Sequence, residues 1–218
     1  MIQPTPQDNF LSTSNYTLQV SAADVLTFWL GDGIALGWPT QDLQKHWFGG
    51  DVALDQEIKT KFGSLVVKAV SGGLQAWEKE PLSRLALVIL LDQFTRNVFR
   101  GDAQAFQGDT LAQKLVLDTL AIESDQQLPW VGRLFTYMPL MHAEDMALQQ
   151  QCVARLTQLV VDAPDLLKPR FRGNLEFAQQ HAEIIARFDR FPYRNAVLGR
   201  ISTPEEEAFL VNGPRFGQ

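Results

Sequence analysis

Apolar residues recur at helical spacing in several separate stretches of the chain. One such stretch follows Asp51 and carries Leu54, Ile58, Phe62, Leu65 and Ala69. Steps of four, four, three and four residues place these side chains on one face of a helix. Asp51 suits the N-cap of this helix, and Gly72-Gly73 suits its end. The pattern therefore predicts an amphipathic helix between these boundaries.

The same spacing predicts helices elsewhere. Ser21 with Asp24, and Thr203 with Glu206, have the capping-box pattern that begins a helix. Pro129 is predicted to begin a short aromatic segment that continues through Tyr137 and is broken by Pro139. The remaining predicted helices cover about 22–30, 82–98, 109 to the closing stretch 125–129, 142–161, 169–188, and a short final helix that stops at Gly213-Pro214.

The apolar run Leu85–Leu91 lies in the most hydrophobic of these helices. A buried strand is the alternative for so short a run, but its length, its leucine content and the lack of flanking turn residues favour a helix. No stretch alternates apolar and polar residues as a half-buried strand does. The sequence therefore predicts an all-α fold of about seven or eight helices around this central one.

Composition and length indicate a single globular domain. The 218 residues are 45% hydrophobic and 20% charged, which is typical of ordinary globular proteins. The longest apolar run is far shorter than the roughly 20 residues that cross a bilayer. We expect a flexible N-terminal arm at 1–20, one helical domain at 21–212 and a tail at 213–218.

Charge and cysteine content bear on location and partners. The net charge of −6 makes nucleic-acid binding unlikely as a general function. Cys152 is the single cysteine, so no intrachain disulfide forms, and its place on an apolar helix face indicates inert packing. With no secretory signal pattern at the N-terminus, the sequence predicts a cytoplasmic protein.

Polar residues on the central helix are the first candidates for chemistry. Asp92, Arg96 and Arg100 follow one another at steps of four residues, and Asn97 lies beside them. Asp92 can pair with Arg96, whereas the two arginines repel each other unless an anion or another carboxylate faces them. Two interpretations follow: an ion-pair network between helices, or a pocket that binds an anion.

A second candidate group follows the Pro139 break. Its acidic members Glu144 and Asp145 suit the positive end of a helix, so capping alone explains them. His142 beside Glu144 could alternatively supply general acid–base chemistry. A metal site that adds His181 lacks the paired helical spacing of known motifs, so we expect no metal and no cofactor. His181 lies among apolar residues and reads as a hydrogen-bonded core histidine.

Basic and aromatic residues alternate around Pro192, in the stretch 187–200. This alternation of basic and aromatic residues can bind single-stranded nucleic acid, but the overall negative charge of the chain argues against such binding. Proline directs Phe191 towards extended geometry, so the chain can fold back across its neighbours. We expect Arg190, Arg194 and Asn195 to reach the polar face that holds Arg96 and Asn97. No nucleophile-elbow or phosphate-loop motif occurs.

Several of these pieces resemble a bacterial family, the domain-of-unknown-function family 924 of the tetratricopeptide-like helical superfamily. The resemblance runs from about Val25 to Leu210. The matching pieces are Val25–Asp32, His46–Phe48, Leu90–Gly101, Pro139–Asp145 with Gln149, and His181–Arg200. It implies an all-helical, solenoid-like antiparallel array and names no reaction.

The sequence departs from the family pattern at four positions. Thr95 stands where the family usually has proline, Ala143 where it has serine, Asp189 where it has glycine, and Tyr193 where it has histidine. A phenol titrates near 10 and binds metals differently from an imidazole. The residue at 193 is therefore a poor candidate for an obligatory metal ligand or proton shuttle.

The predicted function is the binding of a small anionic molecule or an acidic peptide end. Its polar pocket would contain Asp92, Arg96, Asn97, Arg100, His142, Glu144, Asp145, His181, Arg190, Arg194 and Asn195. One alternative is a hydrolase with His142 and Glu144 as acid and base and with arginines that stabilise negative charge. The other is a structural polar network without a ligand.

Overall fold

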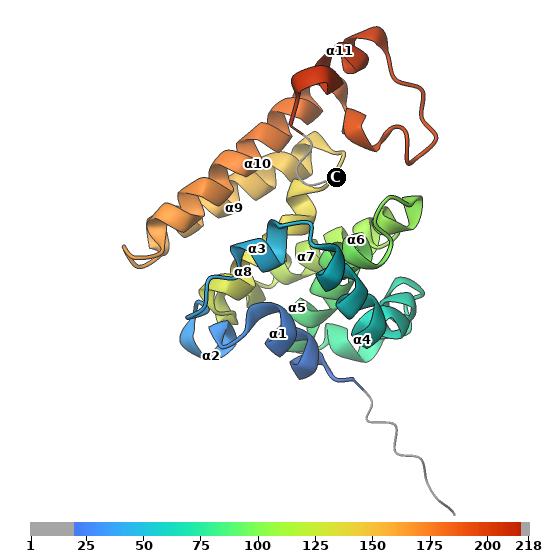
Figure 1. Cartoon of the computed structure of the whole chain (residues 1–218). Helices are drawn as coiled ribbons and strands as arrows, with labels where there is room; N and C mark the ends of the chain where they lie inside the picture. Colours follow the sequence, from blue (N-terminus) through green and yellow to red (C-terminus); the bar gives the residue numbers. More distant parts are fainter. Residues whose placement is uncertain (1–19, 215–218) are drawn as a thin grey trace, which may run out of the picture.

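The computed structural model describes residues 20–214, and this part of the chain is helical without any strand (Figure 1). Short 3₁₀ turns and one π-turn are labelled η. The elements are α1 (Ala22–Leu30), α2 (Gly33–Leu36), α3 (Gln44–Phe48), α4 (Val52–Val70), η1 (Gln75–Glu78), α5 (Pro81–Ile89), η2 (Leu90–Phe94), α6 (Thr95–Val98), η3 (Ala103–Phe106), α7 (Asp109–Ala121), η4 (Ser124–Gln127), α8 (Trp130–Met141), α9 (Met146–Asp162), α10 (Lys168–Phe188), η5 (Pro192–Arg194) and α11 (Pro204–Asn212).

The all-α, single-domain prediction is confirmed. Within residues 20–214, the eight helices of nine or more residues are α1, α4, α5, α7, α8, α9, α10 and α11. Both capping boxes form, at Ser21 with Asp24 and at Thr203 with Glu206. Asp51 caps α4 by accepting a hydrogen bond from the backbone N–H of Ala53. Local sequence signals thus define the N-terminal ends of α1, α4 and α11.

The predicted break at Pro139 is wrong. Helix α8 continues through Pro139 to Met141, and α9 begins only at Met146 rather than at His142. A proline inside a helix removes one backbone hydrogen bond. Here the last turn of α8 is retained by burial, because Leu140 and Met141 lie in the apolar core. His142 is consequently the C-cap of α8, and the N-cap of α9 is Asp145.

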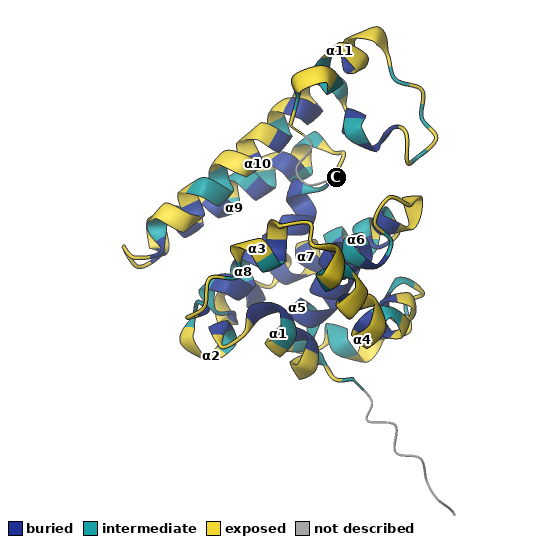
Figure 2. Cartoon of the chain, viewed as in Figure 1, coloured by how far each residue is buried: buried dark blue, intermediate teal, exposed yellow. Residues whose placement is uncertain are grey.

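The core lies around the continuous central helix formed by α5, η2 and α6. This helix contacts α1, α4, α7 and α8, and Leu85–Ile89, the second half of α5, is buried (Figure 2). Helices α9 and α10 pack together as a long antiparallel pair, with α9 against α8 (Figure 1). A second apolar cluster fills the space between α7, α8, α9 and α10.

The central helix contains a π-turn in its middle. The N–H of Thr95 donates to the carbonyl of Leu90, five residues earlier. This shift takes from the Leu91 carbonyl the partner that a regular helix would supply, and the hydroxyl of Thr95 donates to it instead at 2.8 Å. The backbone of Gly108 also packs against Leu91, where a Cβ would collide with the carbonyl oxygen. The π-turn carries Asp92 and Gln93 into the buried interior.

The expected arm and tail lie outside the described residues, except for Val20, Gly213 and Pro214. The domain limits 1–20, 21–212 and 213–218 therefore stay predictions. Among the described helices, none combines the length and the apolar character needed to cross a bilayer.

Candidate functional site

Three distant stretches of sequence meet beside the π-turn, as the sequence analysis expected of the candidate residues. Asp92 contacts His142, which follows α8. Arg96 and Arg194 both contact the carboxylate of Asp109 at the start of α7. Glu144 accepts a hydrogen bond from the backbone N–H of Phe191 at 2.8 Å. Their meeting forms two adjoining polar groups, one around Asp92 and one around Asp109.

Asp92 and His142 form a short polar dyad. Nδ1 of His142 lies 2.7 Å from Oδ1 of Asp92, and Nε2 of Gln93 donates to the other carboxylate oxygen at 2.5 Å. When the imidazole is neutral with its proton on Nδ1, that proton is donated to the carboxylate and Nε2 carries the lone pair. Within residues 20–214, this Nε2 atom has no hydrogen-bond partner. The dyad therefore leaves one nitrogen able to accept a proton.

Asp92 is ionised in this environment. Its side chain is fully enclosed, and burial alone would raise the pKa of the carboxyl. The charges of His142 and Arg96 outweigh burial, together with hydrogen bonds from His142 and Gln93, and lower the pKa of Asp92 to about 2. At neutral pH the dyad thus contains a buried carboxylate.

Gln149 on α9 holds the turn that carries His142. Its side-chain amide donates to the carbonyl of Met141 at 2.6 Å and to that of Ala143 at 2.8 Å, on either side of His142. The ring of His142 lies 6.2 Å from that of His181. Burial, followed by the charge of His142, lowers the pKa of His181 to about 3. His181 is therefore a neutral core side chain, with Nδ1 donating to the carbonyl of Phe177.

Asp109 joins Arg96 to Arg194. Arg96 forms a two-pronged contact with Asp109 at 3.0 and 3.2 Å, and it also donates to the backbone carbonyl of Asp92. Burial would lower the pKa of Arg96, but the charges of Asp109 and Asp92 outweigh burial and raise it. Arg96 thus has two carboxylates near its guanidinium. This half of the cluster agrees with the ion-pair interpretation.

Arg194 has a weaker set of partners. Its Nη1 lies 3.5 Å from Asp109, and Nε has no hydrogen-bond partner in the described part of the chain. The guanidinium packs over the rings of Phe106 and Phe191, with its central carbon 4.6 and 4.5 Å from their centroids. Only 4% of Arg194 is exposed, and burial lowers its pKa. The guanidinium also donates a hydrogen bond to the phenol oxygen of Tyr193.

Arg100 and Asn97 bind a residue of α4 and not the polar groups around Asp92 and Asp109. Arg100 contacts both oxygens of Asp55 at 2.5 and 2.9 Å, and Asn97 donates to the same carboxylate at 2.8 Å. Both ends of this contact are partly exposed. These residues tie the end of the central helix to the first turn of α4.

The other candidate residues support the chain that follows α10. Glu144 binds Arg200 at 2.6 and 2.9 Å, and Asp145 caps α9 through the N–H of Leu148. Burial would raise the pKa of Glu144, but hydrogen bonds from Arg200 and from a backbone N–H hold it below its ordinary value. This geometry favours a structural role for Glu144 over the acid role suggested by the sequence.

Arg190 and Asn195 also hold the C-terminal structure together. Arg190 contacts both carboxylate oxygens of Glu206 in α11, at 2.6 and 2.8 Å. Asn195 donates to Ser202 at 3.0 Å and accepts from Arg200 at 2.9 Å. Neither side chain reaches the polar groups around Asp92 or Asp109.

A small pocket opens beside the arginines. We call it the Arg194 pocket, and its volume is about 70 Å³. Its lining residues are Arg96, Arg100, Gly101, Asp102, Ala105, Phe106, Tyr193, Arg194 and Val197. Burial raises the pKa of Tyr193 to about 12, so the phenol is protonated at neutral pH and can donate a hydrogen bond. The pocket combines cationic, hydroxyl and apolar groups.

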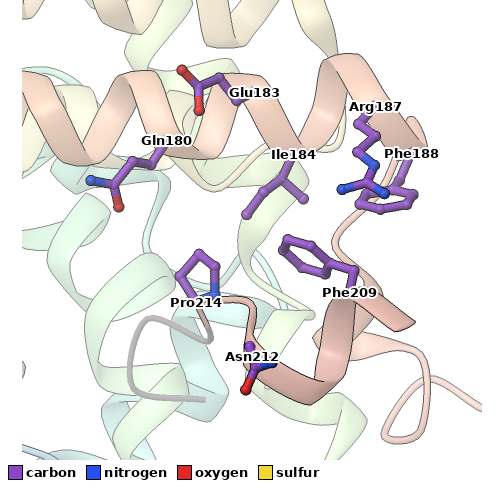
Figure 3. Close-up of a pocket in the computed structure, with 8 residues that line it drawn as sticks. All are labelled: Gln180, Glu183, Ile184, Arg187, Phe188, Phe209, Asn212 and Pro214. Carbon is purple, nitrogen blue, oxygen red and sulfur yellow. The ribbon is translucent and has the colours of Figure 1, made fainter. Parts of the chain in front are cut away.

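A larger pocket of about 540 Å³ lies between α10 and α11 (Figure 3). It is lined by Gln180, Glu183, Ile184, Arg187, Phe188, Phe209, Asn212 and Pro214. Its arginine, Arg187, is exposed and already bound to Glu205. None of the candidate residues predicted from the sequence lines this pocket. In the described part of the chain, no three His, Cys, Asp or Glu side chains gather as a metal site.

Sequence reasoning missed the carboxylates that bind the arginines. It required acidic partners for Arg96 and Arg100 but could not identify Asp109 and Asp55. The only local sign is that each lies in the first turn of a helix, where dipole effects already explain an acidic residue. Gln93, Phe106 and Arg200 were also missed, since nothing in their local sequence indicates a long-range contact.

Comparison with known proteins supplies a family and a fold. The family model described as bacterial protein of unknown function (DUF924) matches residues 25–214. Among solved structures, the chain is similar to a protein of unknown function, ATU0120, from Agrobacterium tumefaciens. The two are 35% identical with a TM-score of 0.71, over 87% of this chain and 96% of that chain. No curated protein matches this sequence.

Proposed function

The chain belongs to the DUF924 family of proteins of unknown function, and we propose from its own geometry that it binds a small anion in the Arg194 pocket. The observation that carries this proposal is that Arg194 is buried and only weakly paired with a carboxylate. A guanidinium this deeply enclosed normally has a carboxylate of its own. Arg194 instead shares Asp109 with Arg96, which lies closer to that carboxylate. An anion in the pocket would supply the missing partner.

The surroundings of Arg194 support this function. Arg96 and Arg100 lie in the wall of the same pocket, so further guanidinium groups are close to Arg194. The ligand would be a free small molecule or the acidic end of a peptide. The lone cysteine is buried and burial raises the pKa of its thiol, so it takes no part. We place this binding function in the cytoplasm.

Thermal unfolding in a panel of anions tests the proposal. Phosphate, sulfate, acetate and propionate would be compared with chloride at one pH and one ionic strength. An anion at about a hundred times its Kd stabilises the folded state by about 2.7 kcal/mol, which raises Tm by several degrees. Arg194→Gln should lose this response. Arg187→Gln, which removes an exposed arginine outside the pocket, should retain it.

Sulfate and phosphate also raise Tm by general exclusion from protein surfaces. The informative quantity is therefore the difference between the responses of the wild-type protein and Arg194→Gln. Equal responses in all three proteins would show that Arg194 binds no anion, and the proposal would fail.

A second candidate function rests on the 2.7 Å contact between Asp92 and His142. In a hydrolase, His142 would accept a proton from water through Nε2, and Asp92 would orient the ring and stabilise its charged form. The partner of His142 is thus Asp92, in an orienting role, and not Glu144 in the acid–base role that the sequence suggested. Turnover of phosphate, carboxylate or peptide esters that His142→Gln abolishes would support this function. Absence of turnover in folded wild-type protein would contradict it.

A further inference from the structure

We infer that the Arg194 pocket selects a short-chain monocarboxylate over phosphate. This inference rests on the proposed function, since it names the chemical class of the anion bound there. Three features of the pocket carry it: its charge balance, the orientation of its guanidinium, and its size with an apolar wall.

The arginines that line the pocket differ in how their charges are paired. Arg96 is bound by Asp109 through two contacts, and Arg100 by Asp55 through two contacts. Only Arg194 lacks a carboxylate of its own. A monoanion compensates this one guanidinium. A dianion would add a second charge close to Asp109, in a largely enclosed site where repulsion between like charges is poorly screened.

The rim of the pocket adds to this preference. Asp102 belongs to its lining and accepts a hydrogen bond from the N–H of Gln104. Its carboxylate is thus a second acidic group near the pocket, beside that of Asp109. A doubly charged phosphate or sulfate therefore meets two carboxylates, Asp102 and Asp109, for a single guanidinium that needs a partner.

The orientation of Arg194 suits a planar group. Its guanidinium packs over the rings of Phe106 and Phe191, which fixes the plane of the fork. Parallel N–H donors in a fixed plane match the two oxygens of a carboxylate. Tyr193 also lines the pocket and keeps its hydroxyl proton at neutral pH. A carboxylate can thus meet charged and neutral donors together.

The size of the pocket limits what accompanies the carboxylate. Its volume of about 70 Å³ is several-fold below the roughly 300–1,000 Å³ of pockets for drug-sized ligands. Ala105, Phe106 and Val197 form an apolar part of the wall. An alkyl group of about two carbons suits this wall, because burial of each CH₂ is favourable by about 0.8 kcal/mol. Propionate is therefore the natural probe.

Isothermal titration of the full chain tests the inference with defined probes. Propionate, acetate, propionamide, inorganic phosphate and sulfate would be titrated at pH 7.5 and constant ionic strength. We expect saturable binding of propionate at least tenfold tighter than that of phosphate or sulfate. Propionamide has nearly the same shape without the charge, so it should not bind measurably.

Three variants locate the site. Arg194→Gln should weaken propionate binding at least tenfold, and Arg187→Gln should leave it unchanged. Val197→Trp places a bulky side chain in the lining of the pocket, so it should also abolish binding. It leaves every charge of the pocket in place, so a loss of binding would be due to the lost space. If Arg194→Gln fails to fold, Val197→Trp still decides the result.

The outcomes separate this inference from the proposed function. If phosphate binds more tightly than propionate and needs Arg194, the carboxylate inference is wrong and the anion-binding function stands. If no anion binds to the folded wild-type protein, both are wrong. Binding of propionate that survives in both Arg194→Gln and Val197→Trp would place the ligand elsewhere and would overturn the inference.

Discussion

Arg96 and Arg194 meet at one carboxylate, and their pairing differs. Arg96 has a two-pronged contact with Asp109 and lies 3.5 Å from a carboxylate oxygen of Asp92. Arg194 has a single long contact with Asp109. Removing one partner of a buried ion pair leaves an uncompensated charge, whereas removing a charge that is poorly paired relieves a desolvation cost. Burial alone therefore does not set what each arginine contributes to stability.

We predict opposite stability effects for these two arginines. Arg96→Met should lower the free energy of unfolding by about 3 kcal/mol or more, because Asp92 and Asp109 lose their shared cation. Arg194→Met should leave the stability of the ligand-free protein within about 1 kcal/mol of wild type, since it exchanges a buried, weakly paired charge for an apolar side chain. Urea unfolding measures both. A loss as large in Arg194→Met as in Arg96→Met would identify Arg194 as purely structural.

Asp92 gives the protein a pH dependence with a defined sign. Its pKa in the folded protein is about 2, below the ordinary value of 3.8. The ionised carboxylate therefore stabilises the folded state above the ordinary value, and this contribution is lost as pH falls from about 4 to about 2. Asp92→Asn should be less stable than wild type at pH 7, and the difference should shrink across this window.

Urea titrations at pH 7, 4, 3 and 2 test this dependence. Asp118→Asn is the control, because Asp118 is an exposed partner of Lys114 in an i,i+4 pair. Its difference from wild type should be small at every pH. A constant difference between wild type and Asp92→Asn across the window would contradict the prediction.

At the scale of elements, the π-turn of the central helix is the feature that positions the dyad. A regular helix leaves no carbonyl unpaired in its interior, whereas this one frees the carbonyl of Leu91. Thr95 repairs the gap with its own side chain. An unpaired polar group here would be buried, because Leu91 and Thr95 are fully enclosed. The hydroxyl of Thr95 therefore stabilises the π-turn in the core, because it supplies the donor that the buried carbonyl of Leu91 needs.

Thr95→Val tests this repair with a substitution of nearly the same shape. We expect a loss of about 1–3 kcal/mol, the cost of leaving a buried carbonyl without its donor. Thr157→Val is the matched control. Thr157 makes the same contact, 2.7 Å to the carbonyl of Val153, but on the exposed face of α9. Its loss should stay within about 0.5 kcal/mol. Chemical denaturation measures both, and equal losses would contradict the argument.

Sequence patterns predict helices better than they predict irregular turns within helices. Spacing and capping identified α1, α4, α10 and α11, because periodicity and caps are local properties. The π-turn depends on Gly108, which packs against Leu91 from a different segment. The last turn of α8 likewise persists through Pro139 because the core encloses it. Such features depend on tertiary contacts that local propensity does not contain.

At the scale of the whole molecule, the candidate site combines what could and could not be predicted. The sequence offered Asp92, Arg96, His142 and Arg194 as candidates and predicted that they lie near one another. It could not divide the roles among them, because these depend on partners such as Asp109, 85 residues from Arg194 along the chain. It also could not foresee that Arg190 binds Glu206 in α11 and that Asn195 binds Ser202 just before α11, away from the pocket.

The wall of the Arg194 pocket depends on how residues 189–212, the C-terminal segment, are attached. Glu144 fixes this segment at two points, through Arg200 and through the N–H of Phe191. Glu144→Gln keeps the shape of the side chain but loses the charge, and charge-assisted hydrogen bonds are roughly twice as strong as neutral ones. Tyr193 and Arg194 lie just after the second point and should lose their fixed position in the variant.

We therefore predict that Glu144→Gln increases amide hydrogen exchange in the C-terminal segment and weakens anion binding, while α1 to α8 keep their protection. The segment can open locally because its attachments are few and the main core lies elsewhere. Glu205→Gln, which removes an exposed partner of Arg187 in α11, should change neither property. If exchange rises equally throughout the protein, Glu144 supports global stability and the pocket wall has no separate attachment.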